Sequence, residues 1–113
     1  MVAELDAAGL PATRDPADVV TMLASAPAVA VVTYDQELRL SVGAAGIGLD
    51  VDVWLVTAPP LDAAAVERLH DALIPAARAL LPLGTVTRDR FDLGDGELPA
   101  YRWLTARSLP YPA

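Results

Sequence analysis

The sequence predicts an α/β (α+β) domain in which helices pack on one face of a single mixed or antiparallel β-sheet. Three segments support this fold class: a β-branched run at residues 28–34, an alternating pattern at 49–57, and an amphipathic helix that begins after Asp62. A chain of 113 residues can build one hydrophobic core but not two, so we expect residues 1–113 to form a single domain. The expected order of elements is roughly ααβββαββ.

Two short helices are expected in the N-terminal part. The first covers residues 5–8 and ends at Gly9, because glycine often follows a helix C-terminus. In the second, Asp15 is the N-cap and Pro16 occupies the first helical position. Pro27 ends this helix. Its apolar stripe comprises Val19, Met22, Leu23 and Ala26.

Three strands are expected in the middle of the chain. Residues 28–34 form a buried strand, and residues 38–42 form a short one after a polar turn. The sequence GAAGIG, residues 43–48, is interpreted as a loop. The pattern LDVDVWLVT at 49–57 alternates between two faces. One face carries Leu49, Val51, Val53 and Leu55, and the other carries Asp50, Asp52, Trp54 and Val56.

A long helix and a hairpin complete the predicted fold. The helix is capped by Asp62, and Pro75 within it predicts a kink. Residues 84–92 have no apolar face, which indicates an edge strand or a contact with another molecule. A Gly-Asp-Gly turn then leads into the last strand at 98–106. The core stripe of the long helix comprises Val66, Leu69, Leu73, Ala77 and Leu80.

Composition and charge exclude several classes of function. The net charge is −7; residues 1–60 carry eight acids and two arginines, whereas residues 61–113 carry seven acids and six arginines. Nucleic-acid binding by counterion release needs clustered basic residues, so repulsion from DNA is expected. The absence of cysteine excludes disulfides and thiol chemistry. Because no secretory signal or membrane span is recognisable, an intracellular soluble domain is expected.

No combination of residues predicts catalysis, so we expect neither an enzyme nor a cofactor or metal site. His70 is the only histidine, and its place at the margin of the helix stripe favours a partly buried structural role. Asp50 and Asp52 share a strand face but lack further oxygen ligands, which favours solvated carboxylates. The glycines of residues 43–48 lack the Lys and Ser/Thr of a P-loop. The serines lie in no GxSxG motif: Ser25, Ser41 and Ser108.

The C-terminal hairpin carries the residue types that are enriched at protein interfaces. Its arginines and aromatic residues are Arg88, Arg90, Arg102, Arg107, Phe91, Tyr101 and Trp103. We predict that this hairpin is buried between chains. In the alternative, Tyr101 and Trp103 fill the domain core and the arginines are solvated. An Arg-rich hairpin on a chain with an acidic first half also favours head-to-tail association, which closes into a ring where the rotation allows.

The order of these features resembles small neck and tail proteins of long-tailed phages of actinobacteria. The strings that carry the resemblance are AAGLPAT, DPADV, PAVAVV, LDVDVWLVTAPP with DAAAVERLHDALIPAARAL, and DGELPAYRWLTAR. The resemblance implies a tail terminator, a virion protein assembled in the host cytoplasm. Its subunits form a ring, typically a hexamer, that ends growth of the tail tube and contacts the head connector. A head-to-tail stopper or adaptor of the same neck is the alternative.

This interpretation assigns roles to specific residues. The tube or a neighbouring subunit would contact Arg88, Arg90, Phe91, Tyr101, Arg102 and Trp103, and an acidic lumen that DNA passes without binding would contain Asp35, Glu37, Asp50 and Asp52. Two hypotheses from other classes stay open. One is a small acidic ligand-binding or regulatory domain in which GAAGIG and the aspartate pair line a pocket. The other is an enzyme that uses His70.

Overall fold

The computed structural model describes residues 1–34, 40–44, 46–80, 85–94 and 96–111. Its elements, in chain order, are α1 (Val2–Ala7), β1 (Ala12–Thr13), the 3-10 turn η1 (Pro16–Asp18), α2 (Val19–Leu23), β2 (Val29–Tyr34), β3 (Leu40–Val42), β4 (Gly46–Val56), α3 (Ala63–Leu80), β5 (Thr87–Asp92) and β6 (Glu97–Pro110). The α+β class and the order of helices and strands are confirmed, with the two-residue β1 as an addition. Among the described residues, no helix has the length and apolarity needed to cross a membrane.

The strands form one mixed sheet. Five of them follow the order β1-β2-β4-β6-β5, and β3 pairs with β4 off this path. β1 and β2 are parallel, whereas the other neighbours are antiparallel. β6 pairs with β4 along its full length, so β2 and β3 share the other side of β4. There β3 pairs with residues 47–49 and β2 with residues 51–56. β5 lies at the end of the order, as expected for an edge strand.

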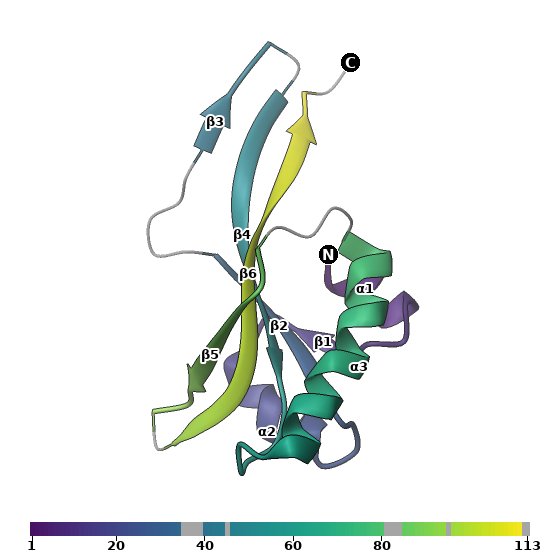
Figure 1. Cartoon of the computed structure of the whole chain (residues 1–113). Coiled ribbons are helices and arrows are strands. Elements are labelled where there is room, and N and C mark those ends of the chain that lie inside the picture. The colour runs from purple at the N-terminus through teal and green to yellow at the C-terminus, as the bar shows by residue number, and fades with distance from the viewer. Residues whose placement is uncertain (35–39, 45, 81–84, 95, 112–113) are drawn as a thin grey trace.

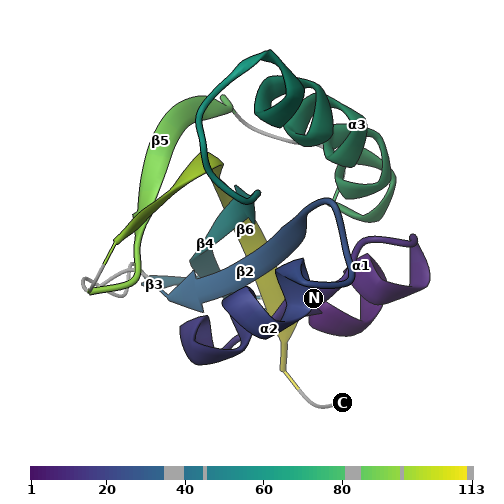
Figure 2. The same cartoon turned by 90° about the horizontal axis from the view of Figure 1, so that it is seen from below.

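Each face of the sheet has its own apolar cluster. α1 and α3 cover one face, where Leu5 and Leu69 pack with Val53 and Trp103. On the opposite face, Val19 of α2 packs in a cluster whose strand members are Val31, Val56, Phe91, Leu98 and Ala100. Figure 2 shows α3 and α2 on opposite sides of β2. The expectation that all helices pack on one face is therefore wrong for α2, because β2 and β4 carry apolar side chains on both faces and both need cover.

Local signals in the sequence locate most helix ends. Gly9 has φ +90° just beyond α1, a conformation that favours glycine. Asp15 and Asp62 cap their helices by accepting hydrogen bonds from the amides of Ala17 and Ala65, at 3.0 and 2.9 Å. The second helix ends at Leu23, earlier than expected. α3 continues through Pro75, and its buried positions are Ala65, Leu69, Ala72, Ala76 and Leu80. Leu69 and Leu80 of the expected stripe are thus buried, whereas Val66, Leu73 and Ala77 are only partly buried.

Two strands are longer than the sequence pattern indicated. The expected loop at residues 43–48 is part of a strand from Gly46 onward. β4 begins at Gly46, which pairs with Pro110 of β6. β3, the first part of β4 and the last part of β6 extend beyond the helices in Figure 1, and we call this three-stranded extension the arm. The arm fits the elongated shape of the molecule, which measures 47 × 28 × 24 Å.

The packing of α3 predicts a large contrast between two of its aliphatic residues. Leu69 is buried between α3 and the sheet, whereas Ile74 is exposed on the same helix. Leu69→Ala should lower the free energy of unfolding by about 2–4 kcal/mol, because it removes buried contacts and leaves a cavity. Ile74→Ala should change it by only about 0.5 kcal/mol. Urea unfolding followed by circular dichroism measures both, and equal losses would contradict the assigned helix face.

Candidate functional site

The most buried charged group in the described part of the chain is Asp52, on the α2 face of β4. Its side chain is paired with Arg102 of β6 in a bidentate arrangement. The Nε atom of Arg102 donates to Oδ1 at 3.0 Å, and a terminal guanidinium nitrogen donates to Oδ2 at 2.7 Å. Two parallel charge-assisted hydrogen bonds are the strongest geometry for such a pair, and they offset the cost of removing the carboxylate from water.

Strand register brings further groups to Arg102. Trp54 lies directly opposite Arg102 in the β4–β6 ladder, and the guanidinium carbon is 4.9 Å from the centre of the Trp54 ring. This distance corresponds to a cation–π contact. On the other side, an oxygen of Asp89 in β5 is 3.8 Å from the guanidinium. Trp54 also meets Phe91 edge to face, with ring centres 5.3 Å apart. Arg102 thus links three strands on one face of the sheet.

These contacts correct the expected role of Asp52. Asp52 is only 4% exposed and pairs within its own chain, so it is not a solvated carboxylate that faces a lumen. Arg102 is the partner of Asp52, and its side chain remains 35% exposed, so its expected contact with another subunit stays a prediction. Asp50 is half-buried, and Asp35 and Glu37 lie outside the described residues. The side chain of Arg107 is likewise outside what the structure describes.

The three aromatic residues of the hairpin lie in the core of the chain itself. Tyr101 and Trp103 belong to the cluster under α3, and Phe91 belongs to the cluster under α2. Their exposure of 2–7% leaves little surface for a subunit contact, so the core role is the correct one for Tyr101 and Trp103. Phe91 and the partly buried Val86 also show that the expected edge segment, residues 84–92, has apolar contacts with the core. Side chains along β6 alternate between the two faces of the sheet, so Tyr101 and Trp103, two residues apart, both lie under α3.

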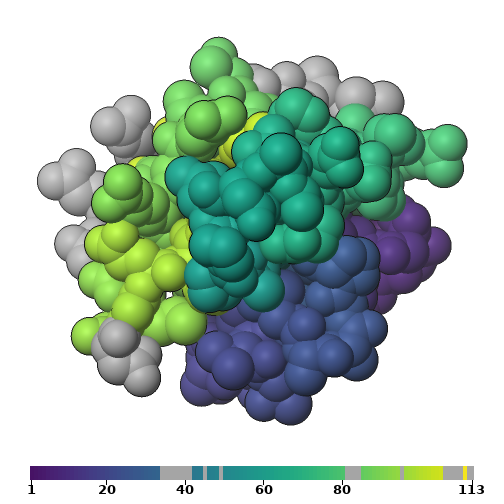
Figure 3. All heavy atoms as spheres, turned by 60° about the horizontal axis from the view of Figure 1, so that its bottom comes forward, coloured from purple at the N-terminus to yellow at the C-terminus, as the bar shows by residue number. Residues whose placement is uncertain are grey.

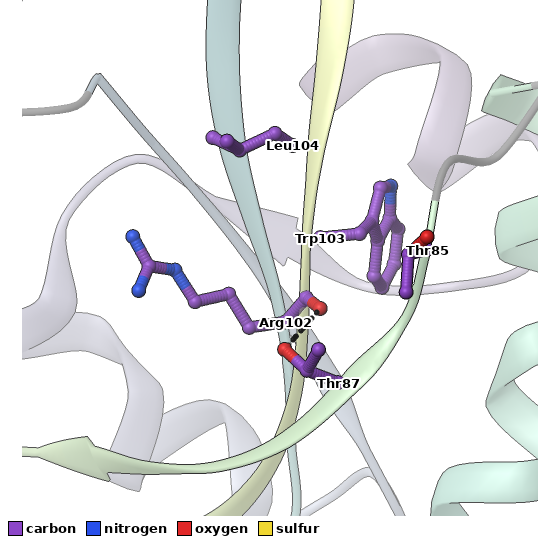
Figure 4. A pocket seen from close by; sticks show the side chains of 5 residues that line it. All are labelled: Thr85, Thr87, Arg102, Trp103 and Leu104. Atoms are coloured by element: carbon purple, nitrogen blue, oxygen red, sulfur yellow. Dashed lines mark hydrogen bonds between the residues drawn. The ribbon is translucent and has the colours of Figure 1, made fainter.

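A hollow of about 330 Å³ opens at the sheet edge where β5 separates from β6. Figure 4 shows its lining residues, with Trp103 on one side of β6 and Arg102 and Leu104 on the other. The Thr87 hydroxyl donates to the carbonyl of Arg102 at 3.2 Å. The indole Nε1 of Trp103 is buried and has no hydrogen-bond partner among the described residues. Of the five described residues that line the hollow, Arg102 is the charged one, and its guanidinium turns to Asp52.

Among the side chains of the hairpin that the structure describes, the exposed arginines are Arg88 and Arg90 on β5. They line a surface hollow of about 480 Å³ whose members, Leu61, Arg88, Asp89, Arg90 and Glu97, we call the arginine surface. Arg90 is 3.5 Å from Glu97 in an exposed ion pair, which contributes little to stability. A smaller hollow beside it is lined by prolines 59 and 99. Figure 3 shows the teal segment before α3 next to the green and yellow β5–β6 hairpin on this face.

His70 is exposed on α3, so the expected partly buried position is wrong. Its ring is tilted against Tyr101, with centres 5.6 Å apart. The described residues contain no group of three or more His, Asp, Glu or Cys side chains that could hold a metal ion.

Sequence reasoning missed two polar contacts that stabilise the sheet. The first is the Asp52–Arg102 pair, which an aspartate between two buried valines could have suggested. The second is Arg68 of α3, which donates to the Thr57 hydroxyl at 2.7 Å and to the carbonyl of Ala58 at 3.1 Å. Thr57 itself donates to the carbonyl of Pro27 at 2.8 Å. No local signal marks this second contact, because it joins the residues after β4, the helix α3 and the loop before β2.

Removal of Arg102 should destabilise the protein far more than removal of an exposed arginine. Arg102→Ala leaves Asp52 buried without its partner, which should cost about 3 kcal/mol of unfolding free energy. Arg90→Ala, which breaks only an exposed pair, should cost at most about 0.5 kcal/mol. Thermal and urea unfolding at pH 7 measure the difference. A loss below about 1 kcal/mol for Arg102→Ala would show that the buried pair is dispensable.

Comparison of the chain with known proteins found no match: no family model, no curated protein and no solved structure is similar to it.

Proposed function

We propose that this chain is a subunit of a ring at the head-proximal end of a phage tail, where it ends growth of the tail tube and joins the tail to the head. The proposal starts from the resemblance in feature order to tail terminators. The observed order of helices and strands is compatible with it. In this proposal the protein belongs to the virion, contacts the tail tube and the head connector, and acts without enzymatic chemistry, cofactor or membrane.

The observation that carries the proposal is a pair of exposed arginines on an acidic chain. Arg88 and Arg90 lie on the arginine surface with Leu61, Asp89 and Glu97, and the whole chain has a net charge of −7. Arg88, beside the exposed Leu61, can pair with an acidic side chain of a second copy, and Arg90 can exchange its exposed pair with Glu97 for such a contact. Because the two surfaces are different, the contact is heterologous and repeats around a closed ring, for which a hexamer is the proposed size. The buried aromatic residues play no part in this contact.

An acidic ring is also suited to the passage of DNA. The proposed lumen contains Asp50, which is half-buried, together with Asp35 and Glu37 of the segment before β3. Asp52 is withdrawn from this list because Arg102 neutralises it inside the sheet. Negative charge along the lumen repels the phosphate backbone, so DNA passes without being held.

Charge reversal on the arginine surface tests the ring. The variant Arg88→Glu/Arg90→Glu should be folded but monomeric, because each lost contact with an acid costs about 1.5 kcal/mol or more. Two lost contacts should therefore raise the concentration at which rings dissociate at least about a hundredfold. Arg78→Glu, on the exposed side of α3, is the matched control and should leave rings intact. Analytical ultracentrifugation and negative-stain imaging measure the outcome. Unchanged rings in the double variant would remove the arginine surface from the contact.

The position in the phage is tested by silencing the gene in its source and imaging the particles. Over-long tails separate from filled heads are expected for a terminator. Tails of normal length beside leaking heads would instead assign the chain to a stopper or adaptor of the same neck. Normal particles would exclude a role in the neck.

A further inference from the structure

The hydrogen bonds of the sheet show which backbone groups of β6 face outward. The amide of Thr57, which follows β4, donates to the carbonyl of Pro99 at 3.1 Å. In an antiparallel ladder the groups that face one neighbour alternate along the strand, so the odd residues of β6 face β4. The even residues face the other way, toward β5. The Thr87 hydroxyl agrees with this, because it donates to the carbonyl of Arg102.

β5 covers only part of this outer edge. Its pairing with β6 begins at Glu97 and stops at Arg102, whereas β6 continues to Pro110 alongside β4. The amides and carbonyls of Leu104, Ala106 and Ser108 therefore point away from the sheet. Among the described residues, no strand pairs with them.

The outer edge of β5 and the uncovered edge of β6 beyond Arg102 differ in their protection against pairing with another strand. At the β5 edge, the charged side chains of Arg88 and Arg90 discourage pairing, and the amide of Arg90 donates to the Asp89 carboxylate at 2.7 Å. The β6 edge beyond Arg102 has the sequence WLTARSLP, with one charged residue and with proline only at its last position. Natural proteins protect strand edges that must stay unpaired. The contrast indicates that the open part of β6 accepts a further strand.

At the opposite edge of the arm, β3 pairs with β4 alone among the described strands. The amide of Gly43 donates to the carbonyl of Gly46 at 3.0 Å, so the odd residues of β3 face β4. The backbone groups of Leu40 and Val42 then face outward, and the Val42 side chain is 73% exposed. β3 and β6 both run antiparallel to β4, so they are parallel to each other. The arm thus presents two different open edges of the same direction.

We propose that β3 of a second copy pairs in parallel with the open edge of β6, so that the sheet continues from one subunit to the next. In this contact the outward groups of Leu40 and Val42 bond to those of Leu104, Ala106 and Ser108. Rotation about a ring axis preserves the direction of a strand along that axis, so strands inclined to the axis can pair in parallel from copy to copy. The exposed side chains of Val42 and Leu104 gain apolar cover. The inference rests on the proposed ring and names the strands that join its subunits.

Cysteine cross-linking tests the pairing in the full-length protein, which has no cysteine of its own. Val42→Cys is combined in turn with Leu104→Cys, Ala106→Cys and Ser108→Cys, and the purified protein is oxidised. At least one combination should give a ladder of disulfide-linked multimers, because adjacent strands bring Cα atoms within disulfide reach. The pair Val42→Cys/Val20→Cys, which joins β3 to the exposed side of α2, should give no ladder. Absence of a ladder in all three combinations would overturn the proposal.

Single-cysteine variants detect other occupants of the edge. Efficient dimers of Ala106→Cys alone would show that two β6 edges pair with each other, and this would overturn the pairing with β3.

A proline substitution tests the backbone hydrogen bonds of the same edge. Ala106→Pro removes one outward amide hydrogen at an edge where proline is tolerated. This variant should convert rings to monomers while the unfolding midpoint of the monomer changes by only a few degrees. Rings that survive this change would also contradict the proposal.

The cross-linking result is independent of the result from imaged particles. A ladder with normal phage particles would keep the strand pairing and remove the neck function. Over-long tails without a ladder would keep the terminator and place its subunit contact elsewhere.

Discussion

The structure depends on the long antiparallel ladder between β4 and β6. All eleven residues of β4 pair with β6, and every other strand except β1 is attached directly to one of these two. Because strand side chains alternate, the register of this single ladder decides which residues meet α3 and which meet α2. A slip by one residue would bring Arg102 under α3 and turn Trp103 outward.

The Asp52–Arg102 pair makes such a slip costly. Trp54 is directly opposite Arg102, and the guanidinium reaches diagonally to Asp52 only in the observed register. In a shifted register the carboxylate would stay buried between Val51 and Val53 without its arginine. An unpaired buried charge is one of the most expensive defects in a protein, so the pair contributes to a unique register as well as to stability. Arg102, which the sequence analysis expected to contact another subunit, thus joins β6 to β4 of its own chain.

The two proposed contacts use different parts of the molecule. The arginine surface lies at the β5–β6 hairpin, and the open strand edges lie on the arm (Figure 1). The first contact would act through charge and would weaken at high salt, since exposed charges are screened. The second would act through backbone hydrogen bonds, which salt affects much less. A ring subunit that uses both would combine attraction at a distance with a directional contact that defines the geometry of the ring.

The sequence alone determined the fold class, the order of the elements and the helix caps at Asp15 and Asp62, because these follow from local periodicity and capping chemistry. It also indicated that residues 84–92 form an edge strand. Only the tertiary structure decided which face each helix covers and which charges are buried. Asp52 and Asp50 look alike in the sequence, and the difference between them arises from Arg102, fifty residues further along the chain. Likewise, Trp103 became a core residue because register placed it under α3. The contacts of Asp52 and Trp103 depend on strand pairing between segments far apart in the chain, and a local sequence pattern does not predict such pairing.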